Sequence, residues 1–193
     1  MSSRPTDDFS HNGADDMSTQ ATLFAEAETE EAPALEFPPE TVFLVSCVSQ
    51  KLPHAAPARY FYTSDWFKKA RSFVEAGGWD WRILSAEYGL VHPDDELKPY
   101  DRRIHDMGAK EHFEWSDWVA RTLHLLSKPG VDPSYAVLAG KVYRKWLVPK
   151  LTCLGGVTCR VPMQGLSIGE QKAWLKDQTA RLRKSNQQTA KTQ

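Results

Sequence analysis

Cysteines, long apolar runs and N-terminal basic residues are scarce in this sequence, and each scarcity excludes a class of protein. The three cysteines, Cys47, Cys153 and Cys159, are too few and too scattered for a disulfide framework or a closed zinc site. No stretch approaches the roughly 20 apolar residues that cross a bilayer, and the N-terminus lacks the basic-then-apolar pattern of a signal peptide. We therefore expect a cytoplasmic protein that holds neither a metal nor another cofactor.

Basic residues are nearly absent from the first 40 positions. Residues 1–40 hold one basic residue against ten acidic ones, a net charge of −9, whereas the rest of the chain holds 23 basic against 15 acidic residues, a net charge of +8. The same 40 positions are poor in large apolar side chains, which predicts a disordered acidic arm. A basic domain behind such an arm suggests a polyanionic partner, DNA above all, although a charge of +8 is also compatible with a domain that is merely soluble.

Apolar periodicity from residue 41 onward alternates between two kinds of element. Apolar and β-branched runs predict strands at 41–47, 81–86, 135–140 and 157–162, and amphipathic stretches predict helices at 64–76, 109–127 and 142–151, with a last one from a capping box at 167–170. The helix at 109–127 places Trp115, Trp118, Val119, Thr122, Leu123 and Leu126 at the spacing of one buried stripe. This order predicts one three-layer α/β domain over 41–178, with a mostly parallel central sheet of about four strands flanked by helices, and a basic polar tail over 179–193.

Each predicted strand is followed by a segment rich in polar and aromatic residues. These segments are SCVSQKLPHAAPARYFYTS, AEYGLVHPDDELKPYD, AGKVYRK and PMQGLSIGEQ. Because ligands of parallel α/β sheets bind beyond the carboxyl ends of the strands, we expect the four segments to converge on one rim.

Cations and glycines in these segments are candidates for contact with a nucleic-acid ligand. Candidate phosphate contacts are Lys51, Arg71, Lys141 and Arg144, each of which could also be a plain surface cation. AGKVYRK lacks the GxxxxGK[ST] pattern of a Walker loop, so Gly140 is expected to pass the chain from strand to helix close to the ligand. Gln164 begins QGLSIGEQ, which is either an anion or base contact or a plain capped helix.

Tyrosines and carboxylates are the candidates for chemistry on a base. Tyr62, Tyr88 and Tyr100 could hold an extruded base. Two carboxylates, Glu87 and Asp101, fit the cleavage of a glycosidic bond. The alternative is that Glu87 pairs with a nearby arginine and Asp101 caps a turn.

Taken together, the motifs SCVSQKL, ARYFYTSDWFKKAR, ILSAEYGLVHPDDELKPYD, LAGKVYR and PMQGLSIGEQKAWL resemble a family of small bacterial and phage domains of unknown function. That family is in turn similar to YaaA-type DNA-binding proteins and to the uracil-glycosylase-like domain of archaeosine synthases. The resemblance covers residues 41–176 and implies an activity like that of antiphage DNA glycosylases, which remove modified bases. Members often carry Lys at the position of Glu87, so the resemblance favours Asp101 as the catalytic carboxylate.

Three functional hypotheses follow. The first is a DNA N-glycosylase in which Asp101 stabilises the oxocarbenium-like state or orients water. The second is a DNA-binding module without catalysis, which needs only the cations and the aromatic rings. The third is an enzyme that acts on free nucleosides or nucleotides.

Overall fold

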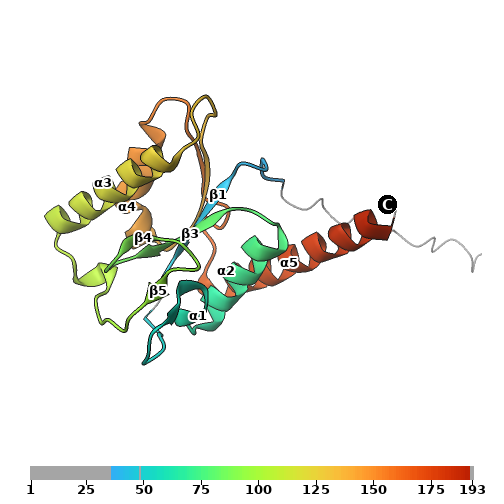
Figure 1. Ribbon diagram of the computed structural model, residues 1–193, viewed down its shortest axis with the longest axis horizontal. Coiled ribbons are helices and arrows are strands. Elements are labelled where there is room, and N and C mark those ends of the chain that lie inside the picture. Colours follow the sequence, from blue (N-terminus) through green and yellow to red (C-terminus); the bar gives the residue numbers. More distant parts are fainter. Residues whose placement is uncertain (1–35, 48, 192–193) are drawn as a thin grey trace, which may run out of the picture. The chain divides into compact units, whose positions relative to one another are not determined.

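A five-stranded sheet with the strand order β4-β3-β1-β6-β7 lies at the centre of the fold (Figure 1). The structure is a computed structural model that describes residues 36–47 and 49–191. Most of the predicted acidic arm, 1–40, lies outside the described residues. The described elements are β1 Val42–Ser46, β2 Ala56–Pro57, α1 Ala58–Phe61, α2 Asp65–Ala76, β3 Trp81–Ser85, β4 Gly89–Val91, β5 Glu96–Leu97, the 3₁₀ helix η1 Ile104–Asp106, α3 Ala109–Leu126, β6 Ser134–Leu138, α4 Lys141–Thr152, β7 Thr158–Arg160 and α5 Ile168–Lys191.

Four of the five strands are parallel, as the order of elements predicts. In the register, Val45 of β1 lies between Ile83 of β3 and Leu138 of β6, and all three side chains are fully buried. The fifth strand, β4, was not predicted and pairs antiparallel with β3. It begins at Gly89, directly after a turn, and is only three residues long, so it is too short to show a period of its own.

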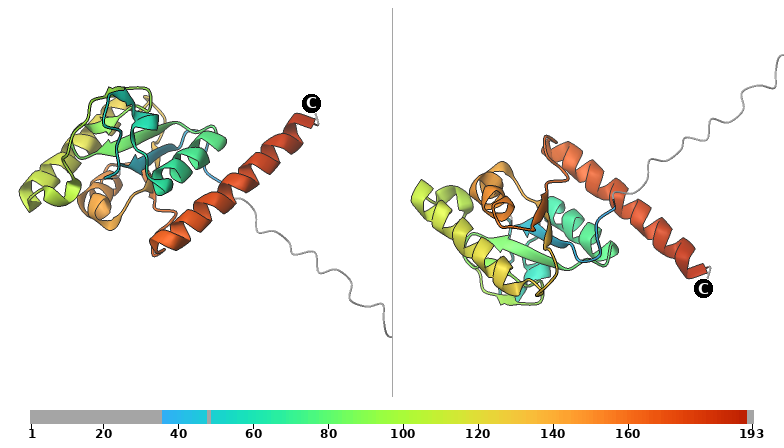
Figure 2. Two further views of the ribbon diagram at one scale, coloured as in Figure 1. Left: turned by 90° about the horizontal axis from the view of Figure 1, so that it is seen from below. Right: turned by 90° about the horizontal axis from the view of Figure 1, so that it is seen from above.

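Helices cover both faces of the sheet, which makes the three predicted layers. Helix α2 packs against α5, and α3 packs against α4. Figure 2 shows the two pairs on opposite sides of the strands. Within the described residues, no helix is long and apolar enough to span a membrane.

The predicted helix starts are confirmed by their hydrogen bonds. Ser64 Oγ accepts from the backbone N–H of Phe67 at 3.2 Å and begins α2. Before α5, Ser167 N donates to Glu170 Oε2 at 2.7 Å and Glu170 N lies 3.4 Å from Ser167 Oγ, the reciprocal pair of a capping box. Helix α5 then continues to Lys191, through residues for which composition suggested a polar tail.

The predicted buried stripe of α3 is wrong at two positions. Trp118 and Leu126 are 51% and 61% exposed. The buried side of α3 consists of His112, Trp115, Ser116, Val119, Ala120 and Leu123. The buried side is thus as wide as predicted but is rotated toward His112, Ser116 and Ala120, because α3 packs against α4 and the edge strand β4.

Candidate functional site

The order of the strands reverses its direction around β1, and this places a crevice at the carboxyl end of that strand. From β1 the chain crosses to β3 on one side and later returns to β6 on the other. Cys47 follows β1 and Tyr143 lies in the first turn of α4, directly after β6, and their Sγ and Oη atoms are 2.9 Å apart. The pair therefore lies at the switch point where ligands of such sheets bind.

A chain of hydroxyl groups lies beside this pair. Tyr100 Oη is 2.8 Å from Tyr62 Oη and 2.9 Å from Ser85 Oγ at the end of β3. Ser85 Oγ also accepts the backbone N–H groups of Glu87 and Tyr88 at 3.3 and 3.1 Å. Because those two donors occupy both lone pairs of Ser85, its own O–H must donate to Tyr100.

The phenol groups of this cluster are held in the neutral form. Burial, and secondarily the nearby Cys47, raises the pKa of Tyr62, Tyr100 and Tyr143 above the usual value for tyrosine. At neutral pH the three side chains can therefore donate hydrogen bonds.

A pocket of about 240 Å³ opens over the Cys47–Tyr143 pair. It is lined by Cys47, Ser49, Lys51, Arg102, Arg103, Ile104, His105 and Tyr143. The lining is rich in cations, which suits an anionic ligand.

The lining cations differ in how far their charge is compensated. Arg102 pairs with Glu111 and lies 3.8 Å from Glu87, and Arg103 pairs with Asp106. Lys51 Nζ instead lies 4.3 Å from the centre of the Tyr100 ring and makes no ion pair within the described part of the chain. Lys51 is thus the lining cation with the charge most available to a ligand.

The structure brings four of the sequence-predicted residues together: Lys51, Tyr62, Tyr88 and Tyr100. The four side chains differ in how much of their surface a ligand could reach. The Tyr62 side chain is 1% exposed, and Lys51 covers a face of the Tyr100 ring. Tyr88 is 37% exposed and meets Tyr100 edge to face at 5.3 Å. Of the predicted base contacts, Tyr88 has the ring most free to stack on a ligand.

The two predicted carboxylates flank this cluster and do not line the pocket. Glu87 is exposed and lies beside Arg102, which is the arginine partner that the alternative interpretation expected. Asp101 is exposed and makes no side-chain hydrogen bond or ion pair with any described residue.

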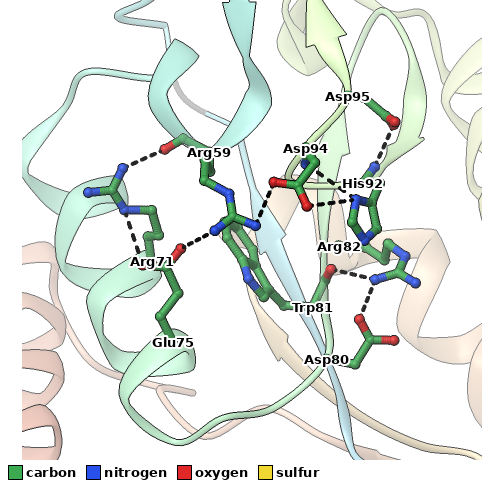
Figure 3. Close-up of polar contacts among 9 residues, drawn as sticks. All are labelled: Arg59, Arg71, Glu75, Asp80, Trp81, Arg82, His92, Asp94 and Asp95. Atoms are coloured by element: carbon green, nitrogen blue, oxygen red, sulfur yellow. Dashed lines mark hydrogen bonds and ion pairs between the residues drawn. The ribbon is translucent and has the colours of Figure 1, made fainter.

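Arg71 does not line the pocket and belongs to a different network of contacts, which Figure 3 shows. It donates to the backbone carbonyl of Arg59 at 2.7 Å, lies 3.7 Å from Glu75 and stacks over Tyr60 at 4.9 Å. Arg59 in turn pairs with Asp94 at 2.7 Å. These contacts hold α1 and α2 against the loop between β4 and β5. They also compensate the charge of Arg71, which was expected to meet phosphate.

The remaining predicted contacts lie at the start of α4 and after β7. Gly140 caps α4 without a side-chain hydrogen bond, and Lys141 is exposed beside it. Arg144 is half-buried, and its Nε has no hydrogen-bond partner among the described groups. Gln164 is exposed in the turn after β7 and does not line the pocket.

Several residues of the site were not predicted from the sequence. Ser85 ends β3, Arg102 and Arg103 directly follow Asp101, and Tyr143 lies inside AGKVYRK. Trp115 of α3 donates from Nε1 to the carbonyl of Ser85 at 3.0 Å and supports the cluster from behind. For Arg102, Arg103 and Tyr143 the available signal was their place in or next to the segments that follow the predicted strands. That signal does not apply to Ser85, which ends a strand, or to Trp115, which lies within α3.

No group of three or more His, Cys, Asp and Glu side chains is placed to hold a metal ion within 36–47 and 49–191. Arginine, lysine and tyrosine groups dominate the pocket instead. What the arrangement offers chemically is cationic attraction, hydrogen-bond donors and an exposed aromatic ring.

Comparison with known proteins places the chain in a family. Residues 42–177 match DUF6884, a family of unknown function, and the chain belongs to this family. UPF0246 proteins of two strains of Caulobacter vibrioides are 34% identical over 83 residues, which is 40% of this chain. The match spans 32% of the length of these relatives.

Proposed function

We propose that this DUF6884 protein binds DNA and holds one nucleotide unit at the carboxyl end of the sheet. The observation that carries the proposal is the position of Lys51, which lines the pocket, has no described ion-pair partner and lies against the tyrosine cluster. A phosphate group would bind Lys51, Arg102 and Arg103 at the exposed rim, where water offsets the cost of burying charge. The base would stack on Tyr88.

The test is equilibrium binding of fluorescently labelled DNA to the wild type and to Lys51→Ala. Because Lys51→Ala removes a charged hydrogen-bond donor, we expect its affinity for DNA to be about tenfold lower. The dependence of that affinity on salt concentration should be shallower by about one released counterion. Lys128→Ala is the matched control, because Lys128 is an exposed lysine beyond the opposite end of the sheet. Absence of DNA binding by the wild type at low salt, or equal affinities of the two variants, would contradict the proposal.

N-glycosidic hydrolysis is a second candidate, favoured by the state of Asp101. This carboxylate directly follows Tyr100 and is not neutralised by a described cation, whereas Glu87 is held by Arg102. A free carboxylate beside a bound nucleotide could stabilise the positive charge that develops on deoxyribose, or could orient the attacking water.

An assay for abasic sites in DNA with ordinary and modified bases tests this candidate. We expect Asp101→Asn to stop base release without weakening DNA binding, and Glu87→Gln to retain base release. If the wild type binds such DNA and releases no base from it, the hydrolase hypothesis fails and the binding proposal stands. Product formation from mononucleotides without affinity for DNA would instead favour an enzyme of free nucleotides.

A further inference from the structure

Trp118 is the most exposed of the seven tryptophans, all of which lie within the described residues. Its side chain is 51% exposed, whereas the other six are buried or half-buried. Tryptophan is enriched at binding surfaces, because its large rigid ring gives much contact area at little entropic cost.

The indole ring is held in place by the turn between β3 and β4. A Cβ atom added at Gly89 would lie 2.0 Å from Cζ3 of Trp118, so the ring packs directly on the glycine backbone. Strand β4 and helix α3 pack side by side at this point (Figure 1). The exposed ring is therefore already ordered before any ligand binds, which lowers the entropic cost of binding.

Trp118 is linked to the pocket through the turn between β3 and β4. Its ring packs on Gly89, and Tyr88, which is 37% exposed, directly precedes that glycine. The Tyr88 ring meets Tyr100 at 5.3 Å, and Lys51 lies over Tyr100 and lines the pocket. Tyr88 and the residue on which Trp118 packs are therefore adjacent in the chain.

Carboxylates on the neighbouring part of α3 are compensated. Glu111 pairs with Arg102, Glu114 lies 3.9 Å from Lys110, and Asp117 lies 2.7 Å from Arg121. Repulsion of a phosphate backbone there is correspondingly reduced.

We propose that Tyr88 and Trp118 form an aromatic platform, in which Tyr88 takes the base of the pocket nucleotide and Trp118 takes the base next to it. This inference rests on the proposed DNA binding and extends it, because the occupant becomes an unpaired stretch of more than one nucleotide. Every base has a π face, so the platform does not require a particular sequence. Bases paired within a duplex would have to unstack before they could reach it.

The experiment compares two probes, thymidine monophosphate and single-stranded oligothymidylate of about eight nucleotides, on four proteins. These are the wild type, Trp118→Ala, Trp118→Phe and the control Phe113→Ala. Phe113 is 47% exposed on the same helix, but its ring meets Trp146 in another groove, so it matches Trp118 in exposure without being part of the platform. Thermal unfolding of each variant checks that the fold is retained.

We expect Trp118→Ala to bind the oligonucleotide about tenfold more weakly and the mononucleotide as tightly as the wild type. Trp118→Phe keeps a ring against Gly89 and should retain most of the affinity, and Phe113→Ala should change neither probe. If the wild type binds the oligonucleotide and Trp118→Ala binds it equally well, the platform is refuted while the proposed function stands. Equal weakening of both probes also refutes it, and a wild type that binds neither probe refutes the platform and the proposed function together.

Discussion

The two ends of the sheet each hold a buried tyrosine whose hydroxyl group bonds a neighbouring side chain, but their surroundings differ. At the amino end, Tyr135 Oη lies 3.1 Å from Ser127 Oγ and donates to the carbonyl of Leu123 at 3.3 Å, which closes the end of α3. At the carboxyl end, Tyr143 Oη bonds Cys47 on the floor of a cationic pocket.

A pocket is also present at the amino end, with a different balance of charge. It is about 190 Å³ in volume, and its polar lining includes Asp80 and Arg82, which pair with each other. Glu40, Asp132 and Lys128 also line it, whereas the carboxyl-end pocket is lined by Lys51, Arg102 and Arg103 and by no carboxylate. A buried tyrosine therefore does not mark a site by itself; the excess of cations beside it is what distinguishes the two ends.

Reversal of charge should separate the two ends most strongly. Lys51→Glu places a carboxylate among the groups that are proposed to meet phosphate, and like-charge contact should lower DNA affinity about 100-fold. Lys128→Glu at the amino end should leave affinity within about twofold. Both DNA affinities are measured by fluorescence anisotropy at one salt concentration. Comparable losses in the two variants would mean that DNA has no preferred site at the carboxyl end of the sheet.

Glycine substitutions compare the turns at the two ends. Gly89 and Gly78 both have a φ of 68°, but only at Gly89 would a Cβ atom strike a neighbour, the Trp118 ring. We expect Gly78→Ala to lower the free energy of unfolding by about 1 kcal/mol, and Gly89→Ala by about 2 kcal/mol, because the ring must also move. Denaturant titration measures both, and equal losses would show that Trp118 is not fixed by the turn.

Removal of single hydroxyl groups tests the comparison at the tyrosines themselves. Tyr143→Phe should lower DNA affinity up to about tenfold through loss of a hydrogen-bond donor at the pocket floor. Tyr135→Phe should cost about 1 kcal/mol of stability and leave affinity unchanged. DNA affinity and thermal unfolding are measured for both variants. An affinity loss in Tyr135→Phe alone would place the DNA site at the amino end of the sheet.

Stability at alkaline pH depends on the same tyrosines. Burial raises the folded-state pKa of Tyr62, Tyr100 and Tyr143 above the value of 10.0 for the free side chain. Above pH 10 the unfolded chain therefore loses protons that the folded chain keeps, and stability is lost as pH rises, by at most about 1.4 kcal/mol per pH unit for each tyrosine. Tyr143→Phe should make this slope shallower in denaturant titrations at several alkaline pH values, and an unchanged slope would show that Tyr143 ionises equally in both states.

Much of the fold could be predicted because the strands and helices carry their own periodic signals. The runs that became β1, β3 and β6 are predominantly apolar, and Ser64 and Ser167 cap helices as their spacing indicates. Strand β4 could not be predicted, since three residues show no period. Trp118 was misplaced because helical spacing fixes which residues share a face but not which of the possible faces the neighbouring elements cover.

The site was only partly predictable, for a different reason. Sequence order shows which residues follow a strand, and it identified Lys51, Tyr88 and Tyr100. It does not show which cations are already paired: Arg71 is tied to Glu75 and Arg59, while Lys51 is not tied to any described carboxylate. The contact between Cys47 and Tyr143 joins residues 96 positions apart, which no local pattern reveals.

Photo-crosslinking of bound single-stranded DNA, with the modified peptides located by mass spectrometry, tests the central claim most directly. If the carboxyl end of the sheet is the binding site, cross-links should fall on Tyr88, Trp118 and the segment 100–105, and Lys51→Glu should abolish them. Cross-links confined to the amino-end pocket around Tyr135, or to the groove between α3 and α4, would contradict the account.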